Sequence, residues 1–240
     1  MARSLDHLLP PVSLDQRLPV LSQGLSLEAW SRIIFLEAPV CDGCGAPFEH
    51  DQGLGARCAA CMGHPRSFDR ARSACVYDDA SRDLVLRFKH GDRPELGLLF
   101  AKWISRAGAD LVRDADMVTP VPLHPGRLFA RRYNQAAEIA RPLARLNRLP
   151  YQPGILRRAR PTPSQGGRSA SGRRKNVQGA FAVHDQRKSL IEGRRIVLVD
   201  DVFTTGATVE SCAGVLLRAG ALAVDVLTVA RVRDAVDLTI

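Results

Sequence analysis

The pattern of apolar and polar positions divides the chain beyond residue 70 into short strands that alternate with helices. The clearest strand is the continuous apolar run at residues 196–199, which is typical of a strand buried on both faces. We predict strands at residues 72–79, 116–124, 150–158, 177–183, 194–201 and 223–232. We predict helices at residues 26–36, 81–91, 94–112, 126–146 and 206–220.

Local sequence features support these helix boundaries. Ser26 suits the N-cap of the first helix, and Gly91 and Gly220 suit helix ends. Pro142 lies inside the helix predicted at residues 126–146, so we expect it to kink or shorten that helix. Strands that alternate with helices predict an α/β fold, a parallel sheet with helices on both faces.

Composition is that of a globular protein, with 45% apolar and 25% charged residues in 240. No apolar run approaches the length of a membrane span, and the first 27 residues lack the apolar core of a signal peptide. We therefore expect a cytoplasmic protein without a membrane span. We divide it into a lead-in with a helix (1–37), a cysteine-bearing segment (38–66) and an α/β domain (67–240).

The net charge of +9 is concentrated in one part of the chain. Residues 119–183 contain thirteen Lys or Arg and one acidic residue, a net +12, so the rest of the chain sums to −3. This asymmetry favours an anionic ligand in that part of the chain, although a basic surface also serves solubility.

Four of the six cysteines form two pairs with a gap of two residues, and thirteen residues separate the pairs. The pairs are Cys41 with Cys44 and Cys58 with Cys61. This spacing predicts a structural Zn²⁺ site, because four thiolates fill its tetrahedral coordination. An iron–sulfur cluster and four unliganded cysteines are the alternatives. We expect the other two cysteines, Cys75 and Cys212, to lie in the core.

The predicted strand 194–201 leads into a turn of small hydroxyl residues that opens the next helix. Free N–H groups at a helix N-terminus attract phosphate, and Gly206 allows a tight turn there. The preceding pair, Asp200 and Asp201, would repel a phosphate but accepts hydrogen bonds from sugar hydroxyls. A ligand with both a phosphate and a diol would suit both the turn and the aspartate pair.

The run of four apolar residues, Asp-Asp, two further residues and Thr-Thr-Gly-x-Thr at 196–208 resembles the phosphoribosyl-pyrophosphate (PRPP) motif of type I phosphoribosyltransferases. Residues 121–140, residues 157–181 and the cysteine pairs extend the resemblance to the ComF family. That family joins a zinc-binding segment to a type I phosphoribosyltransferase-like domain and is linked to natural competence. The resemblance implies that the residues in contact with the ribose and the 5-phosphate are Asp200, Asp201, Thr204, Thr205, Gly206, Ala207 and Thr208. It also implies a catalytic role for Asp200 and Asp201.

The same resemblance implies further ligand contacts and Mg²⁺ bound with the diphosphate. A short loop made of Val121, Pro122, Leu123 and His124 would contact the pyrophosphate. A flexible basic loop at residues 157–176, including Arg158 and Arg168, would close over it, and Lys89 would lie beside the pocket. Each of these features has an ordinary alternative. The basic loop would then be a solvated linker, Lys89 a surface lysine and His124 a hydrogen-bonding loop residue.

Two functional hypotheses follow. In the first, the protein is a phosphoribosyltransferase (a pentosyl-transferring glycosyltransferase) that displaces pyrophosphate from PRPP onto an unidentified acceptor. In the second, it is a competence factor that binds single-stranded DNA, together with other competence proteins, and keeps the PRPP site for regulation. Phe129, Tyr133, Tyr151 and Phe181, interspersed with arginines, would be its stacking residues.

Overall fold

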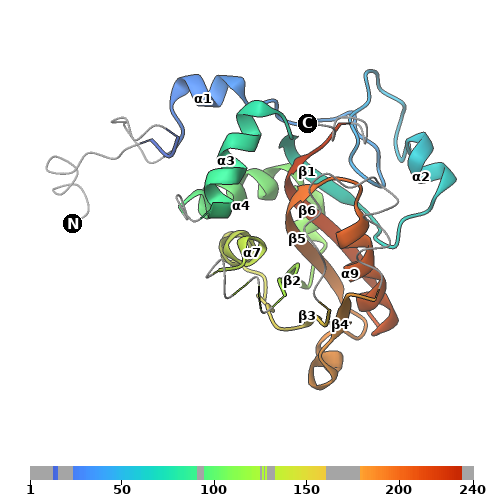
Figure 1. Cartoon of the computed structure of the whole chain (residues 1–240). Coiled ribbons are helices and arrows are strands. Elements are labelled where there is room, and N and C mark those ends of the chain that lie inside the picture. Colours follow the sequence, from blue (N-terminus) through green and yellow to red (C-terminus); the bar gives the residue numbers. More distant parts are fainter. Residues whose placement is uncertain are drawn as a thin grey trace, which may run out of the picture.

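Four parallel strands form the central sheet of the computed structural model, which describes residues 13–15, 24–90, 95–124, 126, 128, 133–160 and 179–233. In spatial order they are β1 (Ala71–Val76), β6 (Ala223–Arg231), β5 (Arg195–Phe203) and β2 (Met117–Pro120) (Figure 1). All three pairings are parallel, which confirms the predicted parallel sheet.

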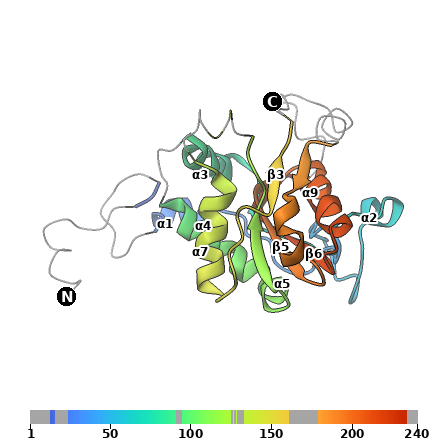
Figure 2. The same cartoon turned by 90° about the horizontal axis from the view of Figure 1, so that it is seen from below.

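Helices cover both faces of this sheet, as predicted. One face packs against α4 (Leu96–Ala107) and α7 (Gln135–Leu146), with α3 (Asp79–His90) beside them. The other face packs against α9 (Ala207–Arg218) (Figure 2). The apolar run of β5 divides its side chains between two fully buried clusters, with Val197 and Val199 facing α7 and Ile196 and Leu198 on the α9 side.

The remaining elements lie around this frame. Two short strands, β3 (Leu156–Arg158) and β4 (Phe181–Val183), pair antiparallel outside the main sheet and are shorter than predicted. The short helical elements are α1 (Leu27–Arg32), α2 (Ala59–Gly63), α5 (Ala109–Arg113) and the 3₁₀ helix η1 (Asp185–Leu190). Among the described helices, none combines the length and apolarity needed to cross a membrane.

The prediction of a single helix at residues 94–112 is wrong, because α4 ends before Gly108 and α5 begins after it. Gly108 adopts a non-helical backbone conformation. A Cβ at this position would lie 2.3 Å from Cδ2 of Leu227 in β6, so the chain passes very close to the sheet there. Periodicity gave no sign of this close approach.

Pro142 does not shorten its helix, contrary to one of the two expectations. α7 passes through Pro142 and continues to Leu146, and Asn134 caps its start by accepting a hydrogen bond from the N–H of Ala136. Six apolar or amide side chains along α7 are buried against the sheet and α4. This packing supports a helix in which one backbone hydrogen bond is missing.

Candidate ligand site and metal centre

The two adjacent aspartates lie where β5 extends beyond its neighbour β2. β2 pairs with β5 only as far as Pro120 opposite Val199, whereas β5 stays paired with β6 as far as Phe203. The strand therefore does not end at the aspartates as predicted but runs two residues further. In parallel sheets, ligands bind at this carboxyl-terminal edge of the strands.

The turn after β5 has the geometry of an anion-binding helix start. Gly206 is the N-cap of α9 and has φ of 81°, a left-handed conformation that favours glycine. A Cβ there would lie 2.8 Å from the ring of Phe203. Gly206 has no side chain to cap the helix, and Oγ1 of Thr205 accepts a hydrogen bond from the N–H of Ala207 at 3.4 Å. The helix start is otherwise suited to an external anion.

Lys89, at the end of α3, lies next to this aspartate pair. Its Nζ is 3.0 Å from Oδ2 of Asp201, and both side chains are mostly buried. Although burial lowers it, the charge and hydrogen bond of Asp201 raise the pKa of Lys89. The structure thus places Lys89 beside the aspartate pair, in contact with a carboxylate.

Asp200 is the group in the site whose ionisation is most disturbed. Burial, followed by the charge of Asp201, raises its pKa to about 7 from an ordinary 3.8, despite a hydrogen bond from the Asp201 N–H. Lys89 and Arg158 partly oppose this rise. Each of the two adjacent carboxylates therefore disfavours the charged form of the other, and the nearby cations offset this only in part.

The position of Lys89 is set by two side chains near the start of α7. The Tyr133 hydroxyl donates a hydrogen bond to the carbonyl of Phe88. Nε2 of Gln135 donates to the carbonyl of Lys89 over 3.2 Å. Sequence patterns did not single out Gln135, since a buried glutamine at a helix start has no distinctive motif.

The loop at Val121–His124 lies beside the aspartates because it continues alongside β5. The Val121 N–H donates to the carbonyl of Val199 at 2.9 Å, and Nδ2 of Asn134 donates to the carbonyl of Val121 at 3.0 Å. Nδ1 of His124 accepts a hydrogen bond from the N–H of Gly126 at 3.2 Å. This contact fits the interpretation of His124 as a loop residue.

Of the predicted basic loop, only residues 157–160 are described, and Arg168 lies outside the described residues. Arg158 belongs to β3 and is buried, with its guanidinium 5.1 Å from the ring centroid of Phe181. Phe181 is therefore buried and offers no stacking face. Among the other aromatic residues proposed to stack with DNA, Phe129 lies outside the described residues and Tyr151 is half-buried beside Arg141.

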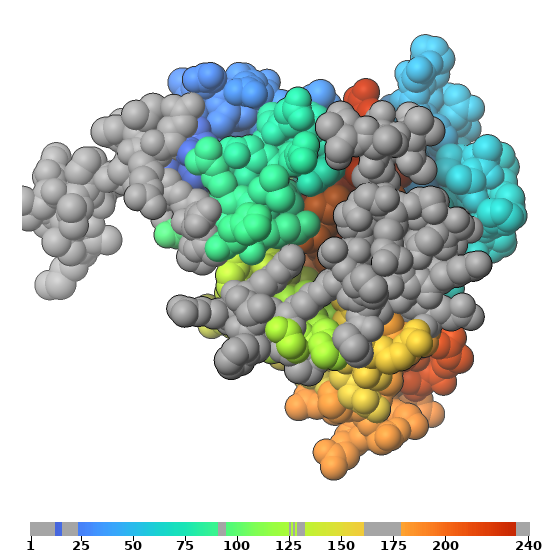
Figure 3. Space-filling view, viewed as in Figure 1, coloured from blue at the N-terminus to red at the C-terminus, as the bar shows by residue number. Residues whose placement is uncertain are grey.

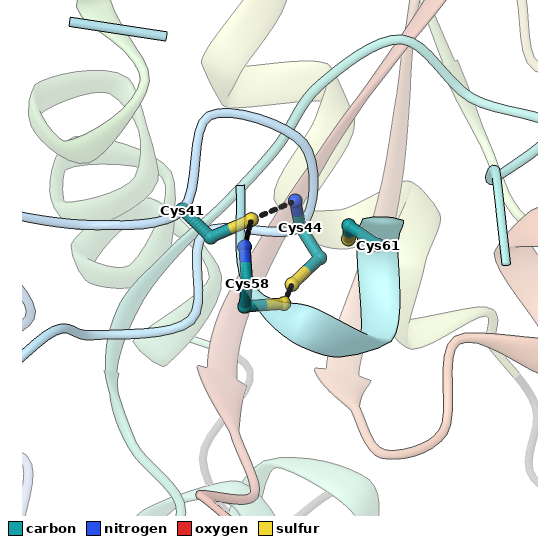
Figure 4. Close-up of side chains that lie close together, drawn as sticks. All are labelled: Cys41, Cys44, Cys58 and Cys61. Carbon is teal, nitrogen blue, oxygen red and sulfur yellow. Dashed lines mark hydrogen bonds between the residues drawn. The ribbon is translucent and has the colours of Figure 1, made fainter. Parts of the chain in front are cut away.

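The four paired cysteines meet in one cluster, with all four sulfur atoms within 4.8 Å of one another (Figure 4). The Cys44 and Cys58 sulfur atoms are 3.6 Å apart. Four sulfurs at about 2.3 Å from a tetrahedral zinc ion would be about 3.8 Å apart. The cluster is therefore positioned to bind a metal ion and fits four-thiolate coordination.

Backbone donors support negative charge at this cluster. The Cys41 sulfur accepts hydrogen bonds from the N–H groups of Cys58 and Cys44, which lower the pKa of that thiol to about 7 although burial raises it. Burial raises the pKa of Cys61, and its nearness to Cys44 raises it further. Cys75 and Cys212 are fully buried elsewhere, as predicted for core cysteines.

Arginines attach the cysteine segment to the α/β domain, and sequence patterns did not single them out. Arg231, at the end of β6, donates to the carbonyl of Cys44 at 2.5 Å. Arg72 donates to the carbonyl of Asp42 at 3.0 Å. Arg66 donates to the Thr205 carbonyl, in the turn at residues 204–208, and to the carboxylate of Glu210 in the first turn of α9. Single arginines in a chain this basic carry no distinguishing motif.

The parallel sheet flanked by helices, with the Asp-Asp and Thr-Thr-Gly-x-Thr sequence at one edge, is a phosphoribosyltransferase-like fold. The chain adds to it an N-terminal cluster of four cysteines that is positioned to bind a metal ion. The chain is 30% identical over 206 residues to DNA utilization protein YhgH of Escherichia coli K12, covering 84% of this chain and 88% of the relative. It is 31% identical over 206 residues to competence protein F of Haemophilus influenzae, covering 80% and 85%. The chain therefore belongs to the ComF family.

Two further comparisons complete these findings. No family model matches the chain. Among solved structures, it is similar to a glutamine PRPP amidotransferase from Bacillus subtilis, with a TM-score of 0.41 and 22% identity. That similarity covers 60% of this chain and 30% of the amidotransferase chain.

Proposed function

We propose that the protein binds PRPP with Mg²⁺ at the carboxyl-terminal edge of β5. The observation that carries this proposal is the placement of Asp200 and Asp201 directly before a glycine-capped helix start. The turn at residues 204–208 would hold the 5-phosphate through backbone N–H groups and threonine hydroxyls. The aspartates would accept hydrogen bonds from the ribose diol.

The charges around the aspartates suit a magnesium-bound diphosphate. Lys89 and Arg158 supply positive charge beside the carboxylates, as their effect on the pKa of Asp200 indicates. Mg²⁺ bound together with the diphosphate would supply a divalent positive charge that offsets the charge of the leaving pyrophosphate. In a transfer reaction, the bond between the ribose C1 and the pyrophosphate oxygen breaks with its electron pair on oxygen, while an acceptor nitrogen bonds to C1 and loses a proton.

We propose Zn²⁺ as the ion of the four-cysteine centre, with a structural role. Four cysteine ligands leave no open position for a substrate or a reactive water. The named functions of the relatives, competence and DNA utilization, support a role of this PRPP site in the use of incoming DNA. Binding of single-stranded DNA is the alternative, and a steep fall of DNA affinity with salt would support it.

Isothermal titration calorimetry with Mg²⁺ and PRPP tests the proposal. The wild-type protein should bind, and the Asp200→Asn/Asp201→Asn variant should lose at least about tenfold in affinity, since charged hydrogen bonds contribute about 1.5–3 kcal/mol each. Asp185→Asn, at an exposed aspartate paired with Lys188, is the matched control and should bind normally. Undiminished binding by the double variant would contradict the proposal. Pyrophosphate release with a panel of amines and nucleobases then separates a transferase from a binding protein.

A further inference from the structure

Arg66 lies between the two sites and contacts both. It follows the second cysteine pair directly, and its side chain is only 13% exposed. Its Nη1 donates to Oε1 of Glu210 at 2.6 Å and to the carbonyl of Thr205 at 3.4 Å. The same guanidinium lies close enough to the thiol of Cys61, one of the four clustered cysteines, to oppose the rise that burial gives the pKa of that thiol.

The residues after Arg66 strengthen this connection. Phe68 is buried, and its ring packs edge-on against Phe203 with centroids 6.1 Å apart. Phe203 is the residue whose ring lies under Gly206. The segment that leaves the cysteine cluster therefore contacts the turn at residues 204–208 through Arg66. It also packs through Phe68 against Phe203, whose ring lies against Gly206. Figure 3 shows the cysteine segment, in light blue to cyan, at one side of the molecule.

Glu210 gives Arg66 an electrostatic task as well. It is the acidic residue in the first turn of α9, where a phosphate would bind. An unpaired carboxylate there would repel that phosphate, whereas the 2.6 Å pairing with Arg66 neutralises it. Cysteines that bind a metal do so as thiolates. In the metal-loaded protein, Arg66 thus bridges two anions, one in each site.

We infer that Arg66 is a positioning residue that couples the four-cysteine metal centre to the phosphate turn at residues 204–208. Metal loading fixes Cys61, Cys61 fixes Arg66, and Arg66 fixes the Thr205 carbonyl and screens Glu210. The ligand of this turn rests on the proposed function, but the coupling itself does not. Loss of the metal should therefore loosen a turn that provides none of its ligands.

Hydrogen–deuterium exchange of the metal-loaded full chain tests the coupling without any ligand. In Arg66→Met, amide exchange in residues 204–210 should accelerate by about tenfold, the effect of losing one charge-assisted contact. Metal content should stay at the wild-type level, and exchange at residues 196–199 should not change. Arg57→Met, at an exposed arginine of the same cysteine segment, is the matched control. If the amides of residues 204–210 exchange in Arg66→Met at the same rate as in the wild type, the inference is overturned.

Chelation provides the decisive comparison. Removing the metal should accelerate exchange of the turn more in the wild type than in Arg66→Met, where only the Phe68 contact still connects the cysteine segment to the turn. Equal acceleration in both would overturn the coupling. If Arg66→Met does not fold, Arg66→Lys replaces it, since it keeps the charge but cannot span all three acceptors, and the same outcomes decide.

Ligand binding adds an independent measurement. In Arg66→Met the affinity for Mg²⁺ and PRPP should fall by about tenfold, and adding Glu210→Gln should restore part of it because the repelling carboxylate is gone. Failure of the wild type to bind PRPP would contradict the proposed function, while the exchange experiments would still decide the coupling.

Discussion

Asp200 shows how a binding site can oppose the stability of its own fold. Its raised pKa means that the folded protein holds a proton there that the unfolded chain has already released. Between about pH 4 and pH 7 the folded state therefore binds more protons, and the contribution of Asp200 to the free energy of unfolding falls as pH rises. At higher pH the protein has a half-buried carboxylate close to a second one.

Replacing Asp200 by an amide should consequently stabilise the protein at alkaline pH. We expect Asp200→Asn to raise the free energy of unfolding at pH 8 by about 1–2 kcal/mol and to leave it unchanged near pH 4. Urea unfolding at both pH values measures this. Asp201→Asn serves as the comparison, because it removes the ion pair with Lys89 and should not give the same gain. A destabilised Asp200→Asn at pH 8 would show that the carboxylate is well solvated.

Gly206 combines a left-handed backbone with a close contact, and the two effects can be separated. Gly206→Ala should destabilise by about 2–3 kcal/mol, from the φ of 81° and from a Cβ pressed against Phe203. Gly193 has a similar φ of 69° but open space around its Cβ position, so Gly193→Ala should cost only about 1 kcal/mol. Thermal unfolding of both variants gives the difference. Equal losses would mean that the ring of Phe203 moves freely and does not support the turn.

Among the elements, α4 and α7 pack unusually closely at one point. A Cβ at Gly97 of α4 would lie 2.8 Å from the carbonyl oxygen of Glu138 in α7. That carbonyl is the one whose helical partner would be the N–H of residue 142, which proline lacks. Pro142 thus leaves the Glu138 carbonyl without its helical hydrogen bond at the point where Gly97 of the neighbouring helix has no side chain.

This geometry predicts opposite effects for alanine at two helical glycines. Gly97→Ala should destabilise by about 1–3 kcal/mol, because a backbone carbonyl cannot move aside cheaply. Gly214→Ala in α9 should stabilise by up to about 1 kcal/mol, since its nearest neighbour is the flexible end of Arg218. Denaturant midpoints of the two variants measure both effects. Stabilisation by Gly97→Ala would mean that α4 and α7 are less closely packed than the structure shows.

These two elements also mark how far the sequence predicts the fold. The alternation of strands and helices along the sequence was sufficient to predict a parallel sheet with helices on both faces, because each element carries its own apolar pattern. The break at Gly108 and the intact α7 were not predictable, since each depends on contacts with residues distant in sequence. The site divides similarly: the motif identified Asp200 and Asp201, whereas Arg66 required the tertiary structure.

At the scale of the whole molecule, the cysteine segment is an extension of the domain core. Cys41, Cys44 and Cys61 belong to the same buried cluster as Ile196 and Leu198 of β5. Polar contacts reinforce this attachment: the carbonyl of Gly43 accepts the N–H of Ala71 at 2.7 Å, and a Cβ at Gly45 would lie 2.4 Å from the Ala71 carbonyl. The metal centre should therefore influence the stability of the α/β domain as well as its own loops.

Removal of the metal should accordingly lower the thermal stability of the whole chain while leaving part of the sheet folded. We expect chelation to reduce the unfolding midpoint by about 10 °C, since several kcal/mol of metal binding are linked to folding. The α7 side of the sheet has its own buried cluster, built on Val197 and Val199, so its amides should keep slow exchange.

Calorimetric scans with and without chelator provide the measurement, and two cysteine variants make it specific. Cys41→Ser/Cys44→Ser should start from the lower midpoint and not respond to chelator, because half of the ligand set is gone. Cys212→Ala removes a buried cysteine that is not one of the four metal-ligand candidates. The unfolding midpoint of this variant should still fall on addition of chelator, whatever the substitution itself costs in stability. A wild-type midpoint that chelator does not change would mean that the cluster holds no metal or that its metal does not stabilise the domain. Loss of slow exchange at Val197 and Val199 on chelation would instead show that the metal centre and the sheet unfold as one cooperative unit.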